Sequence, residues 1–172
     1  MICISLSPPY ATLIALNLKK IETRGWATSH RGQLGIHQTL APGPRGTTEA
    51  DLHAIVRNRP FCDVLFQPLG CTDSLQVCAV LPRGKIVAVV DLRGCIQVDS
   101  EQLVSYSIPG VDDWFFTDQE RAFGDYSPGR WAWLLTNVRA LPEPVSARGM
   151  PGLWRADAAT TAAVEMQLGG TA

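Results

Sequence analysis

Two apolar stretches constrain the fold of this chain more than any other feature. The first covers residues 85–92 and follows a Pro-Arg-Gly turn, while the second covers residues 131–141. Short apolar runs bounded by turn residues are typical of strands with little exposed surface. We therefore expect residues 85–92 to be a central strand and residues 131–141 to be a second strong strand, with Trp131 and Trp133 on one face.

Length and composition favour one domain made of short elements. The chain has 172 residues, of which 46% are hydrophobic and 18% charged, so it can bury a substantial core. Its 15 glycines and 12 prolines interrupt regular structure often. We expect one domain over residues 1–155, with a peripheral insertion at about 38–84, followed by a C-terminal helix and frayed tail over 156–172.

The remaining periodicities indicate a mixed α+β protein. Strands are expected at residues 2–6, 19–24 and 32–37, with an amphipathic helix over 8–18 after the first strand. Within the insertion we expect one helix capped by Thr47 or Thr48, and another capped by Thr72 that buries Leu75 and Ala79. Residues 99–126 are acidic and are expected to be irregular. A helix inserted after the first strand favours a small mixed β-barrel over an alternating βαβ sheet.

Charge is distributed unevenly although its sum is only −1. Residues 1–46 hold five basic residues against one acidic residue, whereas residues 99–125 hold seven acidic residues against one basic residue. Residues 126–155 are again basic. If the first and last segments meet in space, they form a basic cleft in a nearly neutral protein. The alternative is that these charges lie on solvated faces.

Other classes of protein are excluded or disfavoured by simple patterns. The five cysteines are odd in number and lack a CxxC spacing, which argues against a disulfide framework and a zinc ribbon. We expect no metal and no cofactor. The first residues do not read as a signal peptide, and no apolar run approaches the length of a membrane span. A cytoplasmic protein with no membrane partner is the resulting expectation.

Lys20, Glu22 and Arg24 alternate along a predicted strand and would share one face. On such a face the two cations can hold a phosphate while the carboxylate orients the guanidinium. The alternative is a row of internal salt bridges without a ligand. Lys19 adds positive charge next to this group.

Further candidates for binding follow in the sequence. Trp26 either stacks on a base or seals the end of the barrel, and Arg31 lies close to it in the sequence. A turn at residues 127–129 would present Tyr126 and Arg130 beside the last strand. We assign Arg130 as a second phosphate contact.

Five segments in order along the chain carry a resemblance to a known family. They are SPPYATLIALNLKKIETRGW, RGQLGIHQ, LPRGKIVAVVDL, FGDYSPGRWAWLLTNVRAL and GMPGLW. This arrangement resembles the ASCH domain family, and the element similar to GxKxxExR is its most specific part. The usual glycine of that element is Asn17 here, which is the next best residue for a left-handed helix end.

The resemblance implies a PUA-like β-barrel, related to YTH and EVE domains, with a cleft beside the first helix. It also implies binding of RNA, another nucleic acid or a nucleotide. One bacterial branch of the family hydrolyses N4-acetylcytidine, and another is associated with ribonuclease activity. By that likeness Lys20, Thr23 and Glu120 would form a catalytic set if the protein is an enzyme. A protein-interaction module is a third hypothesis.

Overall fold

We describe residues 1–98 and 117–169 in a computed structural model of the chain. Their strands form one curved sheet of six strands in the order β2-β5-β4-β3-β1-β6. The sheet is mixed, because β1 and β3 run parallel whereas the other neighbours are antiparallel. The strands are β1 (Ile2–Leu6), β2 (Ile21–Arg24), β3 (Gly32–Gln38), β4 (Lys85–Gln97), β5 (Trp131–Ser146) and β6 (Leu153–Arg155).

The two apolar stretches form the centre of this sheet, as the sequence predicts. β4 lies between β3 and β5, and β5 lies between β4 and β2. The β4–β5 ladder contains three register shifts, which are β-bulges or irregularities. Bulges increase local twist, so they help this long pair to curl. The prediction of a mixed α+β barrel-like fold is therefore confirmed.

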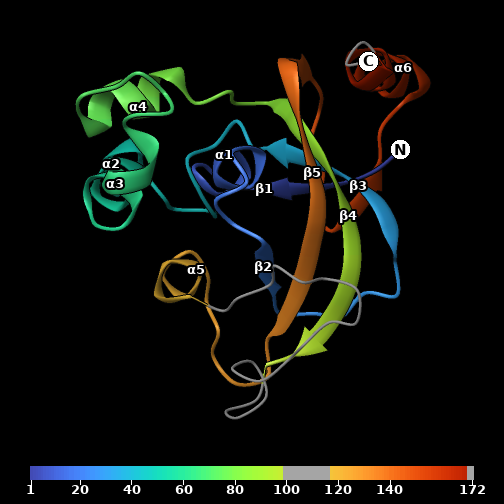
Figure 1. Ribbon diagram of the computed structural model, residues 1–172, viewed down its shortest axis with the longest axis horizontal. Coiled ribbons are helices and arrows are strands. Elements are labelled where there is room, and N and C mark those ends of the chain that lie inside the picture. Colours follow the sequence, from blue (N-terminus) through green and yellow to red (C-terminus); the bar gives the residue numbers. More distant parts are fainter. Residues whose placement is uncertain (99–116, 170–172) are drawn as a thin grey trace.

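The main core lies between the sheet and α1 (Tyr10–Ala15), which follows β1 directly. Ala11 and Ile14 of this helix pack among buried side chains of β1, β3, β4 and β5, including Trp133. Figure 1 shows α2–α4 beyond α1, on the side away from β4 and β5, and α6 at the opposite edge of the molecule. The helix is shorter than the predicted range of 8–18.

The chain between β3 and β4 contains three helices: α2 (Glu49–Arg57), α3 (Phe61–Leu65) and α4 (Ser74–Val80). They share a second core with α1, in which Leu52 and Val77 are fully buried beside Leu13. Thr48 caps α2 as predicted, through a capping box with Asp51.

The prediction for the helix near residue 72 is wrong in its cap and in its buried face. Asp73 caps α4, and its side chain accepts a hydrogen bond from the amide of Gln76. The helix buries Val77, while Leu75 is 67% exposed. The buried positions are Ser74 and Val77, three residues apart on one face of the helix, instead of Leu75 and Ala79.

Two further helices, α5 and α6, lie in the second half of the described chain. α5 (Asp118–Ala122) begins at the cap Thr117, inside the range that we expected to be irregular. Residues 99–116 of that acidic range lie outside the described residues. α6 (Ala158–Gly169) packs through Val164 on a third core with Trp154. No helix among residues 1–98 and 117–169 is long and apolar enough to span a membrane.

Candidate functional site

A left-handed residue at the end of α1 brings the chain into the site. Asn17 has a φ of 58°, and the amide of Leu18 donates a 2.9 Å hydrogen bond to the carbonyl of Leu13. This is the geometry that ends many helices, and Asn tolerates it better than most residues other than Gly. The turn places Lys19 inside the protein immediately before β2 begins.

Lys19 is the buried cation of the site, with no exposed surface. Its Nζ donates hydrogen bonds to the carbonyl oxygens of Ile21 and Phe123, the latter at 2.8 Å. Two carboxylates complete its surroundings, with Glu22 at 3.8 Å and Glu120 at 3.9 Å. Burial lowers the pKa of Lys19, and the two carboxylates oppose that shift.

Glu120 joins α5 to the start of β2. It is 5% exposed and accepts hydrogen bonds from the backbone amides of Lys20 at 2.8 Å and Ile21 at 3.0 Å. The hydroxyl of Tyr126 also donates to it, at 3.4 Å. Burial raises the pKa of Glu120, whereas the charge of Lys19 and the two amides act in the opposite direction. This carboxylate therefore fixes two segments that are 99 residues or more apart in the chain.

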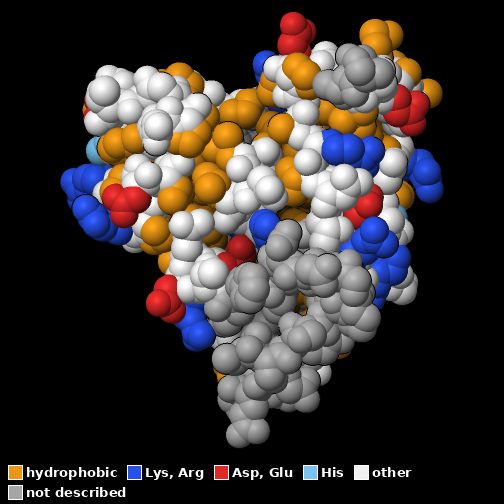
Figure 2. Space-filling view, in the orientation of Figure 1, with side chains coloured by type: hydrophobic (Ala, Val, Ile, Leu, Met, Phe, Trp, Pro, Cys, Tyr) orange, Lys and Arg blue, Asp and Glu red, His pale blue; other side chains and the backbone are white. Residues whose placement is uncertain are grey.

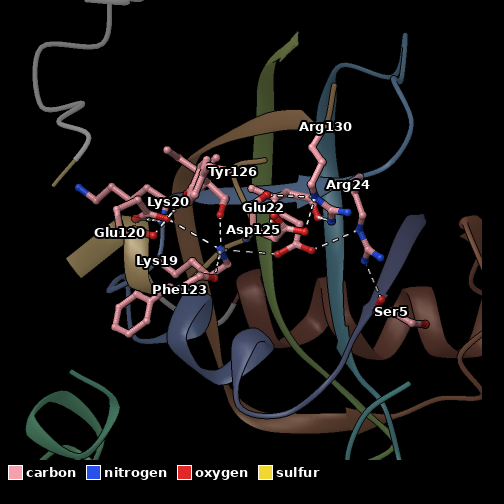
Figure 3. Close-up of polar contacts among 12 residues, drawn as sticks. Ser5, Lys19, Lys20, Glu22, Arg24, Glu120, Phe123, Asp125, Tyr126 and Arg130 are labelled. Atoms are coloured by element: carbon pink, nitrogen blue, oxygen red, sulfur yellow. Dashed lines mark hydrogen bonds and ion pairs between the residues drawn. The ribbon is translucent and has the colours of Figure 1, made fainter. Parts of the chain in front are cut away.

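The alternation of β2 directs Glu22 and Arg24 to the face opposite Ile21 and Thr23. Ile21 and Thr23 are buried, and the two charged residues are partly exposed. Arg24 Nε lies 3.2 Å from Glu22 Oε1, and Arg24 Nη2 donates a 2.9 Å hydrogen bond to the carbonyl of Ser5. Figure 3 shows this connection between β2 and β1.

A cavity of about 510 Å³ lies beside these residues. Its wall combines the end of β1 and start of α1, the strand β2, the turn at residues 42–47, α2, and the chain after α5. The lining residues are Ser5, Leu6, Ser7, Pro8, Tyr10, Glu22, Thr23, Arg24, Pro42, Gly43, Pro44, Thr47, Ile55, Ala122, Phe123, Gly124, Asp125 and Arg130. The segment between β3 and β4 thus supplies part of the wall.

Arg130 lines the cavity from the chain that precedes β5. Its Nε donates to the carbonyl of Asp125 at 3.0 Å, and its Nη2 donates to the carbonyl of Thr23 at 3.2 Å. The Asp125 carboxylate lies 3.3 Å from the same guanidinium. The amide of Asp125 in turn donates to the hydroxyl of Thr23 at 3.1 Å. Arg130 therefore holds the end of β2 against the turn after α5.

The structure brings part of the predicted site together at the cavity. Glu22, Thr23, Arg24 and Arg130 line it, and Lys19 lies behind this group in the network of buried charges. Figure 3 shows the side chain of Lys20 extending away from Glu22 and Arg24.

Three other predicted binding residues lie elsewhere. Trp26 is 38% exposed, and its ring packs edge-on against Trp133 at 4.7 Å, as expected of a side chain that closes the barrel. Arg31 is exposed and donates to the backbone carbonyls of Thr28 and His30. Tyr126 does not belong to the cavity wall, and its hydroxyl instead contacts Glu120.

The three residues proposed for catalysis occupy different positions around the site. Thr23 lines the cavity, whereas Glu120 is bound to backbone amides. In the described chain no contact joins the ammonium of Lys20 to Thr23. The buried amine is that of Lys19, and the residue three positions later is Glu22, which has no hydroxyl to act as a nucleophile.

Several lining residues were not identified from the sequence. Tyr10 and Phe123 belong to one aromatic cluster, since Phe61 lies 6.1 Å from the first ring and 5.0 Å from the second. Residues 42–47 and Ile55 also reach the cavity. No local pattern in the sequence indicated that this turn would face β2.

The site shows no centre for a metal among residues 1–98 and 117–169. No group of three or more His, Cys, Asp or Glu side chains there is placed to hold an ion. The five cysteines are free thiols. What the cavity offers is hydrogen-bonding groups, two guanidinium groups, two carboxylates and apolar surface.

The curved mixed sheet, with α1 in its core and a cavity beside that helix, defines an α+β protein of the PUA-like class. A family model described as the ASCH domain matches residues 4–144. The chain therefore belongs to the ASCH domain family, and the resemblance seen in the sequence is confirmed.

Two relatives are the proteins named Activating signal cointegrator 1 from Mus musculus and Homo sapiens. Each is 26% identical over 159 residues, which is 90% of this chain and 22% of the relative. The chain thus spans about a fifth of the length of these relatives. A crystal structure of a mutant ZmASCH protein from Zymomonas mobilis is also similar, at 15% identity and a TM-score of 0.50, covering 96% of both chains. At that identity the likeness concerns the fold alone.

Proposed function

We propose that this protein is a nucleic-acid-binding module, with RNA as the ligand, and that the cavity beside α1 receives one nucleotide unit. The observation that carries the proposal is that Arg24 and Arg130, from separate parts of the chain, line one cavity of about 510 Å³. Pockets of about 300–1,000 Å³ are typical of sites for small molecules and cofactors. A nucleotide fits that range, whereas a longer stretch of strand needs an open groove.

The composition of the wall agrees with this ligand. Tyr10 offers an aromatic surface, and Ser5, Ser7 and Thr23 offer hydroxyl groups. Stacking of a base on an aromatic side chain contributes about 1–3 kcal/mol. Membership of the ASCH family supports the same conclusion, since the family is associated with RNA binding in related proteins.

Fluorescence anisotropy with a labelled single-stranded RNA octamer of mixed sequence tests this function. We expect saturable binding at low salt, and a loss of about tenfold or more in affinity for Arg130→Ala, because one of the two guanidinium groups that attract the polyanion is removed. Arg93→Ala is the matched control, since Arg93 is exposed, lies outside the cavity wall and donates through Nε to Thr136 at 3.4 Å. The proposal fails if wild-type protein does not bind the octamer, or if both variants bind equally well.

A protein-interaction role is a second candidate, favoured by exposed apolar side chains on α4. Leu75 is 67% exposed and Val80 is 53% exposed. Figure 2 shows hydrophobic side chains gathered over the region of α2–α4 on one face of the molecule. Affinity capture from a nuclease-treated extract, with Leu75→Asp as the negative control, separates this role from RNA-mediated association.

A further inference from the structure

The charges that line the cavity cancel. Two carboxylates, those of Glu22 and Asp125, stand against the guanidinium groups of Arg24 and Arg130. On the face drawn in Figure 2, acidic and basic side chains are likewise interspersed. A phosphate group carries a negative charge and would have to enter beside two carboxylates, which is unfavourable where water is partly excluded.

The two arginines also direct much of their hydrogen-bonding capacity toward the protein itself. Arginine binds phosphate best through two parallel N–H groups on one edge. In Arg130 both Nε and Nη2 already donate to backbone carbonyls, at 3.0 and 3.2 Å. In Arg24 the corresponding nitrogens lie against Glu22 and the carbonyl of Ser5. Neither arginine therefore presents its Nε–Nη2 edge freely to a phosphate in the cavity.

The other polar and apolar groups of the cavity wall suit an uncharged ring that has hydrogen-bonding groups on its edges. Glu22 offers an acceptor on the cavity wall, and its side chain is 13% exposed. Beside it, Arg24 Nη1 has no hydrogen-bond partner in the described part of the chain and can donate to a ring oxygen or nitrogen. Tyr10, Pro42 and Ile55 provide partly exposed apolar surface for the faces of a ring.

We propose that the cavity binds the nucleobase of the nucleotide unit and leaves its phosphates outside, with Glu22 accepting an N–H of the base. This inference rests on the proposed function, because it specifies which part of the nucleic acid enters the cavity. Glu22 is then a specificity-determining residue, since a base with a blocked N–H cannot donate a hydrogen bond to this partly buried acceptor. The guanidinium groups of Arg24 and Arg130 attract the polyanion through their charge and not by direct contact with a phosphate in the cavity.

Amide chemical shifts of the wild-type protein test the inference directly. The probes are the four ribonucleosides, inorganic phosphate and ribose 5-phosphate, each titrated into isotope-labelled protein at constant ionic strength. We expect at least one nucleoside to shift the amides of Thr23, Gly43 and Gly124, which line the cavity, in a saturable way. The two phosphate probes should leave these amides unchanged.

Each other outcome has a defined meaning. If the phosphate probes shift the cavity amides and the nucleosides do not, the base assignment is overturned and RNA binding survives. If RNA binds while no probe shifts these amides, the base assignment is again overturned. If neither RNA nor any probe binds, both the inference and the proposed function fail.

Glu22→Gln tests the named contact. The side-chain amide of glutamine has nearly the same shape as the carboxylate of glutamate but carries no charge. The affinity for the nucleoside that binds the wild-type protein should therefore fall about tenfold or more. Glu143→Gln is the matched control, because Glu143 is exposed on β5. Retained dispersion of the amide spectrum shows that the variant is folded. Equal nucleoside affinity in folded Glu22→Gln and wild type would overturn the role of Glu22.

Discussion

Replacing Lys19 with Met should destabilise the protein far more than the loss of an ordinary salt bridge does. Lys19 is fully buried between Glu22 and Glu120, and it donates to two backbone carbonyls. Methionine fills a similar volume but removes the cation that the two carboxylates share and the donor to both carbonyls. Removal of one member of a buried ion pair costs about 3–5 kcal/mol.

Urea unfolding followed by circular dichroism measures this loss. In thermal unfolding, a loss of about 3–5 kcal/mol in the free energy of unfolding lowers the Tm of a chain of this size by about 6–20 °C. Arg59→Ala is the control, since Arg59 is 84% exposed in its ion pair with Asp63 and should contribute almost nothing. The double variant Lys19→Met/Glu120→Gln should recover part of the loss, because it removes one of the stranded charges.

The reasoning would be refuted by a loss below about 1 kcal/mol for Lys19→Met, which is the range of exposed pairs. It would also be refuted if the double variant showed simple addition of the two single effects. Addition would mean that Lys19 and Glu120 do not interact across 3.9 Å, in spite of their shared burial.

Three further predictions address separate parts of the structure. Burial raises the pKa of Glu120 above 4.5, so protonated Glu120 stabilises the folded state below pH 4.5 and this contribution is lost as pH rises through the raised pKa. Glu120→Gln should abolish this part of the pH dependence of the free energy of unfolding. Urea unfolding from pH 4 to 8 measures it. Gly149→Ala should cost about 1–3 kcal/mol, because the new Cβ would lie 2.4 Å from His37 Cε1, whereas Gly25→Ala meets nothing within 4 Å and should be neutral in thermal unfolding. If the site is hydrolytic, incubation with N4-acetylcytidine releases cytidine and Thr23→Ala stops the release; chromatography that detects no cytidine with wild-type protein rejects this activity.

The sequence pattern predicted those helices and strands that depend mainly on interactions between residues close together in the chain. The apolar stretches near residues 85 and 131 became the central strands, and the cap at Thr48 formed as expected. The helix near residue 72 was misplaced because Thr72 and Asp73 are both good caps, and the choice between them depends on packing of Val77 against α1 and α2.

The candidate site was less predictable because its geometry depends on contacts between distant segments. Lys19 and Lys20 are adjacent and chemically identical, so nothing in the local sequence determines which one points inward. The partners of Lys19 that decide this, Phe123 and Glu120, lie about a hundred residues away. Alternation along β2 accounts for Glu22 and Arg24 on one face, but Lys20, which we expected on the same face, precedes the strand and extends away from them.

The electrostatics of the site are best understood as a means of positioning rather than of attraction. Four charged groups around β2, Lys19, Glu22, Arg24 and Glu120, neutralise one another while their hydrogen bonds fix α5, β1 and β2 in place. An arrangement of this kind costs stability, since burial disfavours each charge. The same arrangement favours binding of a ligand that is recognised by the direction of its hydrogen bonds. The acceptor on Glu22 and the donor on Arg24 are already oriented before the ligand binds. An uncharged base requires that orientation, because it offers no net charge for the site to attract.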